Sequence, residues 1–382
     1  MADVHVYLSP GLFGFARLAG FDYLQHLQKA LAERFEALGR EAEIRVVDVH
    51  PSASIRRRAA RLARLVSDTA GSGGGPIHLL GHSTGGLDLR LLASPGAWLV
   101  EGALSPLGWL GRVRSITTMN TPHRGTPLAG FFATPNGQRL LYAISAITVT
   151  ALRLGAPPLA VTSVLMAVMA RTQRRAGLEI ELVERITDAL LRVLDDQTAI
   201  EVRSWLRKIR DDRGAIVQLM PESMDLFQAT VLDRPGLRYQ SVASYAPTSR
   251  AIDWARHLRT PWTALSAGLF QLIHRTTAGL DPHYPCAPAD GGNAPLRDFL
   301  KELPPANAND GIVPLRSQLW GTPVWVGKAD HLDVVGYFRG GREHSDWLSC
   351  GARFDRKGFG AMMDAIVAGM VAGEAGRTAE GT

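Results

Sequence analysis

Hydrophobic positions in the first third of the chain alternate between strand-like and helix-like spacing. Short apolar or β-branched runs, typical of buried strands, occur as VHVYLSP, EIRVVDV, IHLLGH and SITTMN. Between them, apolar residues recur at helical spacing over residues 21–38, around the arginines of 56–64, and over about 84–92. Gly39 ends the first of these segments, and GSGGGP forms a flexible turn after the second. This alternation predicts an α/β fold with a mostly parallel, doubly wound sheet.

The alternation stops after Pro127. The following segment carries helical patterns such as LEIELVERITDALLRVL and TAIEVRSWLRKIRDD, and strand-like runs return as RYQSVASYA and PVWVGKA. We therefore predict a sheet core in two parts, 1–127 and 236–371, with a helical cap inserted at 128–235. The small and polar end of the chain, 372–382, is expected to be a disordered tail.

One strongly apolar stretch, residues 140–170, lies inside the predicted cap. Arg153, Gly155, Pro157 and Pro158 interrupt it near its middle. Each half is too short to cross roughly 30 Å of hydrocarbon, so we expect no transmembrane segment. The pattern instead predicts two apolar helices joined by a turn. They form either a plain packing layer or a lid that lines a pocket for an apolar substrate.

Composition and charge fit a globular protein. The chain has 382 residues, of which 46% are hydrophobic and 20% charged, enough for one large domain with an insertion or for two ordinary domains. The net charge of +6 could indicate an anionic partner such as nucleic acid. However, the densest basic cluster has the helical spacing of a solvated helix face, and consists of Arg56, Arg57, Arg58, Arg61 and Arg64. We therefore expect no nucleic-acid partner.

Cysteine use and the start of the chain bear on the compartment. Cys286 and Cys350 have no metal-ligand spacing and could form one disulfide or remain free thiols. The start, MADVHVYLSP, has no basic region followed by an apolar stretch. A cytoplasmic location is the expectation, unless a leader was removed.

The segment LLGHSTGGLD contains a nucleophile-elbow pattern, in which Gly81, Ser83 and Gly85 alternate. Such an elbow needs a buried strand, a tight turn that only small neighbours tolerate, and a departing helix. IHLLGHS followed by TGGLDLRLL supplies these three in order. Ser83 is therefore the candidate nucleophile.

A serine hydroxyl needs a base that takes its proton and a carboxylate that orients the base. In folds with this elbow, the acid and then the histidine follow the serine along the chain. Asp310 in ANDGIVPL and His331 after the strand-like PVWVGK have that order. His344 is a rival base, His82 is interpreted as structural, and His123 as a residue of the site wall.

The oxyanion of an acyl-transfer reaction needs two backbone N–H donors. Thr84, directly after the nucleophile, is one candidate. Leu12 in the loop SPGLFGF is the other, because Gly11 and Gly14 would let the backbone approach closely. The alternative for this loop is an ordinary glycine-rich turn between strand and helix.

Six short motifs carry a resemblance to a known family. PGLFG, GHSTGGLDLR, TTMNTPHRGTPLA, QLMPESM, NDGIVP and HLDVV occur in this order. The chain thereby resembles the bacterial triacylglycerol lipases of the Pseudomonas and Burkholderia type, in the α/β-hydrolase superfamily. The likeness reaches both ends of the predicted core, and within the helical block it is limited to QLMPESM near the end of that block.

The resemblance implies an α/β-hydrolase fold with Ser83 as nucleophile, His331 as base and Asp310 as triad acid. It also implies that Leu12 and Thr84 donate to the oxyanion.

A calcium site near the histidine loop is a further implication of the resemblance. The family's ligand two residues after the catalytic histidine corresponds to Asp333. The partner carboxylate, some twenty residues before the triad acid, corresponds to Asp290. Pro10 stands where the family usually has histidine, which removes a side-chain contact from the oxyanion loop.

Together these features predict a lipase-like serine ester hydrolase that cleaves acyl esters with an apolar acyl chain through an acyl-enzyme. The expected partners are an ester or lipid substrate and, transiently, a lipid interface, and no cofactor is expected for catalysis. An intracellular carboxylesterase or a polyester depolymerase is the alternative within enzymes. A non-catalytic pseudo-hydrolase that binds lipid or protein is the alternative from another class.

Overall fold

The computed structural model describes residues 2–12, 18, 22–70, 74–97, 99, 107–154, 191–192, 194–247, 260–340 and 346–375. Its centre is a six-stranded sheet of order β2-β1-β3-β4-β5-β6, in which every neighbouring pair is parallel. The strands are β1 (Val4–Ser9), β2 (Ala42–Val46), β3 (Ile77–His82), β4 (Val113–Met119), β5 (Arg238–Tyr245) and β6 (Thr322–Lys328). The doubly wound parallel sheet expected from the sequence is confirmed.

Helices cover both faces of the sheet, and the two-residue period of the strands divides their side chains between two hydrophobic cores. In β1, Val4, Val6 and Leu8 belong to one core, and Tyr7 belongs to the other. The first core includes α1 (Gln25–Ala37) and α14 (Arg356–Ala375), and the second includes α2 (Ile55–Ala70) and α3 (Thr84–Ala93).

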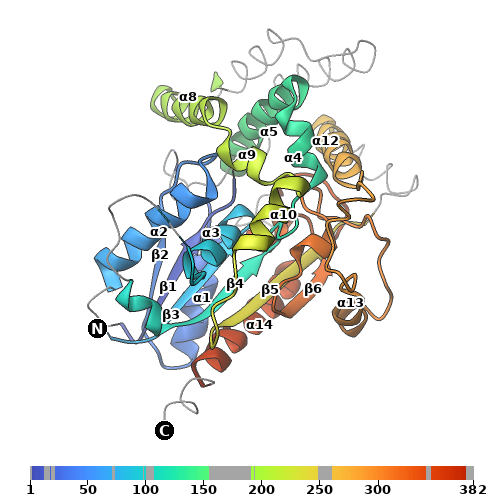
Figure 1. Ribbon diagram of the computed structural model, residues 1–382. Coiled ribbons are helices and arrows are strands. Elements are labelled where there is room, and N and C mark those ends of the chain that lie inside the picture. Colours follow the sequence, from blue (N-terminus) through green and yellow to red (C-terminus); the bar gives the residue numbers. More distant parts are fainter. Residues whose placement is uncertain are drawn as a thin grey trace.

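Further helices gather at one end of the sheet, beyond the strands (Figure 1). Between β4 and β5 the described elements are α4 (Pro127–Ala133), α5 (Pro135–Leu154), α8 (Asp196–Asp211), α9 (Gly214–Gln218) and α10 (Pro221–Thr230). Between β5 and β6 lie α12 (Pro261–Thr277) and α13 (Asn293–Leu300). α12 contacts α4, so the layer of helices at this end also includes a helix from the predicted second part of the core, 236–371. The second predicted apolar helix falls on residues outside the described ranges.

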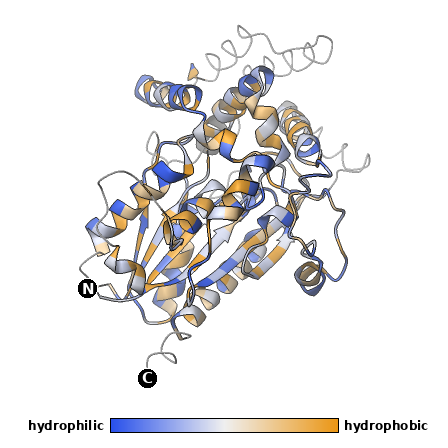
Figure 2. Cartoon of the chain, in the orientation of Figure 1, coloured by the Kyte–Doolittle hydropathy of each residue, from blue (hydrophilic) through white to orange (hydrophobic). Residues whose placement is uncertain are grey.

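Local sequence signals set where several of these helices begin. Thr126 accepts a hydrogen bond from the Leu128 amide, and Pro127 occupies the first turn of α4. Asp195 caps α8 in the same way. α8 is amphipathic, and Figure 2 shows hydrophilic and hydrophobic residues on its different sides, with Trp205 and Leu206 among those buried.

One expectation about the end of the chain needs correction. α14 continues to Ala375, past the predicted start of a disordered tail at residue 372. Among the described residues, α14 is the one helix whose length and composition would also allow it to cross a membrane. Here it packs along the sheet through a row of buried residues, which includes Met362, Met363 and Ile366.

The arginine-rich helix α2 is not solvated at every arginine. Arg56, Arg57, Arg61 and Arg64 are exposed as expected, whereas Arg58 is buried with 1% of its surface accessible. The helical spacing predicted the exposed face correctly, but Arg58 is buried because it pairs with the buried Asp88 of α3.

Candidate active site

Ser83 stands in the turn between β3 and α3 with backbone angles φ 55° and ψ −127°. This positive φ is strained for a residue with a side chain and is characteristic of a functional turn. It lifts the hydroxyl out of the sheet at the carboxyl end of β3. The elbow predicted from the sequence therefore has its strand, turn and helix in place.

The glycines of the elbow are required by close backbone approach. A Cβ on Gly81 would lie 2.4 Å from the Gly85 carbonyl carbon, and one on Gly85 would lie 2.1 Å from the Ser9 oxygen. Gly86 faces the Thr121 side chain at similarly short range. Because contacts this short are sterically forbidden, larger residues would push β1, β3 and α3 apart.

A hydrogen bond connects the Asp310 and His331 side chains, which lie in the loops before and after β6. His331 Nδ1 donates to Asp310 Oδ2 at 2.7 Å, and the His331 amide donates to the Asp310 carbonyl at 3.0 Å. Asp310 is fully buried, and its other carboxylate oxygen accepts from the Ile312 and Val313 amides at 2.8 and 2.7 Å. With Nδ1 protonated, His331 Nε2 is left with its lone pair, as a general base requires.

Two polar residues that the sequence reasoning missed hold the same carboxylate. Asn120 Nδ2 donates to Asp310 Oδ2 at 2.8 Å, and Gln318 Nε2 donates to it at 3.3 Å. Asn120 directly follows β4, in the motif TTMN, and has a positive φ of 49°. Its place at a strand end was the only sequence signal of its role.

His82 holds the backbone of His331 in place through a hydrogen bond. Its Nε2 donates to the His331 carbonyl at 2.9 Å, and its Nδ1 accepts from the Tyr23 hydroxyl at 3.2 Å. Burial lowers the pKa of His82 well below 6.5, and the neighbouring His331 lowers it further. The ring therefore stays neutral and can hold both bonds, which agrees with the structural role expected for it.

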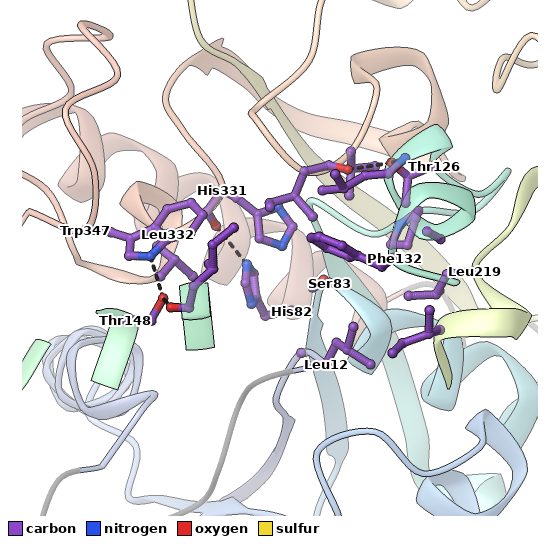
Figure 3. A pocket seen from close by; sticks show the side chains of 18 of the residues that line it. Leu12, His82, Ser83, Thr126, Phe132, Thr148, Leu219, His331, Leu332 and Trp347 are labelled. Atoms are coloured by element: carbon purple, nitrogen blue, oxygen red, sulfur yellow. Dashed lines mark hydrogen bonds between the residues drawn. The ribbon is translucent and has the colours of Figure 1, made fainter. Parts of the chain in front are cut away.

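Ser83 and His331 line one pocket, together with Gly11 and Leu12 of the loop after β1 (Figure 3). The pocket encloses about 880 Å³ of empty space, part of it open to solvent. The cap helices α4, α5 and α9 contribute mainly apolar side chains to its walls, among them Leu128, Ala129, Phe132, Ile144, Val149 and Ile216. The first apolar helix of the cap thus faces the pocket.

The loop after β1 lies against the nucleophile. A Cβ on Gly11 would lie 2.8 Å from Ser83 Cβ, so glycine is needed for this approach. Leu12 follows in the same loop and lines the pocket, and Thr84 begins α3 directly after Ser83. The structure thus brings the two predicted oxyanion donors to the same side chain.

A buried ion pair anchors this loop from beneath. Arg58 Nε donates to both carboxylate oxygens of Asp88 at 3.1 and 3.0 Å, and Arg58 Nη2 donates to the Pro10 carbonyl. The Ser9 hydroxyl donates to Asp88 at 2.8 Å. Arg58 and Asp88 thereby tie α2, α3 and the end of β1 together, where Pro10 cannot supply a side-chain contact.

The other two candidate histidines are placed differently. His123 is fully buried behind the pocket wall, with Nε2 bonded to Thr118 Oγ1 at 3.1 Å and its ring stacked on Trp320. It is a packing residue and not a residue of the site wall, because Pro122 and Thr126 on either side line the pocket instead. His344 lies outside the described residues.

The two predicted calcium ligands have different surroundings. Asp290 is exposed in the turn before α13, where it accepts from the Gly292 amide at 2.9 Å and lies near Arg124. Asp333 is buried and shares a cluster with Asp330 and Cys350, whose potential ligand atoms lie within 4.8 Å of one another. Asp290 belongs to no such group of three among the described residues, so its pairing with Asp333 stays a prediction.

The cluster around Asp333 nevertheless has the chemistry of a cation site. Asp330 Oδ2 is buried and has no hydrogen-bond partner among the described residues. Burial, and next the charge of Asp330, raises the pKa of Asp333, and burial raises the pKa of Asp346 nearby to about 8. Buried like-charged carboxylates with an unused oxygen fit a hard divalent cation such as Ca²⁺, whose charge would offset their repulsion.

Comparisons with known proteins find sequence similarity to a bacterial lipase over part of the chain and structural similarity to solved lipases and esterases. The chain matches no known family model. Over 125 residues it is 31% identical to a triacylglycerol lipase of Vibrio cholerae, a stretch that covers 32% of this chain and 34% of that protein. The match therefore spans only about a third of the length of this relative.

Solved structures show the fold over nearly the whole chain. EstA from Clostridium botulinum matches with a TM-score of 0.50 and 17% identity, over 96% of this chain and 88% of that one. The lipase of Staphylococcus hyicus matches with a TM-score of 0.50 and 18% identity, over 98% and 97%. The chain thus has the α/β-hydrolase fold of bacterial lipases and esterases. The Pseudomonas and Burkholderia type stays a prediction.

Proposed function

We propose that the chain is a serine ester hydrolase that cleaves esters with an apolar acyl chain. The observation that carries the proposal is the strained Ser83 in one pocket with a His331 whose Nδ1 is held by buried Asp310. The apolar pocket walls favour an alkyl acyl group over a charged or sugar-like one. The likeness to lipases and esterases supports the same chemistry.

The proposed reaction has two halves. Ser83 Oγ attacks the ester carbonyl while His331 Nε2 takes its proton, and the Leu12 and Thr84 amides stabilise the oxyanion. Collapse of the tetrahedral intermediate breaks the bond to the alkoxide, which leaves as the alcohol with the proton from His331. Water, deprotonated by the same nitrogen, then attacks the acyl-Ser83, and the acid is released as the serine regains its proton.

Labelling with a fluorophosphonate tests the proposal. The folded protein should react covalently at one serine, and peptide mapping should identify Ser83. The Ser83→Ala variant is the control and should not be labelled. A folded wild-type chain that neither reacts nor hydrolyses p-nitrophenyl esters would be a pseudo-hydrolase, and the proposal would be wrong.

We further propose that a divalent cation, most simply Ca²⁺, is held by Asp330 and Asp333 with Asp346 beside them. The support is the buried cluster and the unused oxygen of Asp330. Asp330 and Asp333 flank His331 in the sequence, so the ion would stabilise the loop that carries the base without taking part in the reaction. Asp290 has no part in this proposal.

A further inference from the structure

The pocket extends to both sides of Ser83 (Figure 3). In this view Phe132 and Leu219 lie on one side, Trp347 and Thr148 lie on the other, and Leu12 lies below Ser83. His331 lies between Ser83 and Trp347 in this view, and its neighbour Leu332 lines the same side. The catalytic pair therefore separates two apolar arms, which we call the Phe132 arm and the Trp347 arm.

A hydrogen bond closes the Trp347 arm. The indole Nε1 of Trp347 donates to Thr148 Oγ1 at 2.8 Å, and the Thr148 hydroxyl itself donates to the Ile144 carbonyl at 2.8 Å. Because Thr148 uses its own proton within α5, its oxygen is free to accept from the indole. Trp347 is only 4% exposed. The bond thus joins the cap helix to the loop that follows the base and fixes the indole as an end wall.

The chemistry of the reaction assigns the two arms. His331 must pass its proton to the departing alkoxide, so the alcohol part of the ester has to lie on the His331 side of Ser83. The acyl chain then occupies the opposite arm, towards Phe132. We infer that Trp347, held by Thr148, is a specificity-determining residue that restricts the substrates to esters of short, apolar alcohols. This inference rests on the proposed function and adds the identity of the leaving group.

Size discrimination against a fixed wall is substantial. One methylene group too many or too few in an apolar pocket changes kcat/KM by roughly 10- to 200-fold. The Trp347 arm carries no charged side chain among its described residues, so a glycosyl or charged alcohol gains no partner there. Methyl and ethyl esters should therefore be preferred over octyl esters and over emulsified triacylglycerols, whose leaving group is a diacylglycerol.

Two matched ester series test the inference. The first keeps a butyryl group and varies the alcohol from methyl to octyl, and the second keeps p-nitrophenol and varies the acyl group from acetyl to dodecanoyl. In Trp347→Ala, the octyl-to-methyl ratio of kcat/KM should rise by about tenfold or more in the first series. Its acyl profile in the second series should keep its shape.

Phe132→Ala is the matched control, because it removes an aromatic wall from the other arm. It should change the acyl series and leave the alcohol ratio unchanged. Thr148→Val nearly keeps the side-chain volume and removes only the acceptor of the indole proton. It should therefore move the alcohol ratio in the same direction as Trp347→Ala by a smaller factor, and it carries the test if Trp347→Ala does not fold.

The outcomes separate this inference from the proposed function. If wild type cleaves esters and labels at Ser83 but Trp347→Ala and Thr148→Val change only the acyl series, or neither series, the assignment of the arm is wrong. Wild-type cleavage of octyl esters or emulsified triacylglycerols as fast as methyl esters would overturn it as well. Absence of any esterase activity and of labelling would instead refute the proposed function itself.

Discussion

Replacing Asp310 with Asn tests how the base acquires its working tautomer. The Asp310 oxygen bonded to the Ile312 and Val313 amides has to remain an acceptor, since both donors are fixed backbone groups. The new amide nitrogen would therefore occupy the position of Oδ2 and donate towards His331 Nδ1. That bond stabilises the tautomer with its proton on Nε2, which faces the nucleophile and cannot take its proton.

The size of the effect follows from this change of tautomer. An Asp-to-Asn change in a serine triad lowers kcat by about 10⁴-fold, equivalent to about 5 kcal/mol of lost transition-state stabilisation. The free energy of unfolding should decrease by less than this. Asn120 Oδ1 is buried without a hydrogen-bond partner among the described residues, and it can accept from the new amide if the Asn120 side-chain amide flips. A residual unpaired donor would cost roughly 1–3 kcal/mol.

The assay is kcat and KM with p-nitrophenyl butyrate, next to circular dichroism and thermal unfolding of the same preparation. Asp290→Asn provides the control, since it makes the same chemical change at an exposed acid away from the pocket, and its kcat should stay within about twofold of wild type. A well-folded Asp310→Asn variant that kept more than a tenth of the wild-type kcat would refute the tautomer argument and the role of Asp310.

Three further predictions concern the nucleophile, the cation and acid stability. Ser83→Ala should fold normally and lose on the order of 10⁶-fold in kcat, and a comparable kcat in a folded variant would remove Ser83 from the mechanism. Chelation of divalent cations should lower the melting temperature of wild type and of Asp290→Asn but not of Asp333→Asn, by mass action on the folded state, and equal responses in all three would exclude the site. Burial lowers the folded-state pKa of His78 below its unfolded value near 6.5, so the folded state binds fewer protons and stability should be lost as pH falls below about 6.5. His78→Gln should reduce that slope in melting temperature against pH, and an unchanged slope would assign it to other buried histidines.

The sequence alone was enough to predict the parallel sheet and to name Ser83, Asp310 and His331 as candidate catalytic residues. The alternation of VHVYLSP, EIRVVDV and IHLLGH with helical spacing predicted the parallel sheet, because burial on two faces imposes a two-residue period on strands. The glycines around Ser83 predicted the elbow, because the tight turn itself brings Gly81 against Gly85 within a few residues. Asp310 and His331 could be named because this fold keeps the order of its functional loops along the chain.

Tertiary structure alone decided which distant side chains meet. Nothing in the local pattern of α2 distinguishes Arg58 from its exposed neighbours, since its partner Asp88 lies on another helix. Asn120 reaches Asp310 from a strand end far away in the chain, and Trp347 meets Thr148 across the pocket.

The cation site shows the same limit. The family spacing selected Asp290 by its distance along the chain, whereas the fold surrounds Asp333 with Asp330 and Cys350 and leaves Asp290 exposed. Periodicity reports which face of an element is buried, because burial acts on each element separately. Long-range hydrogen bonds and ligand sets depend on how the elements pack together, and that arrangement leaves no repeating signal in the sequence.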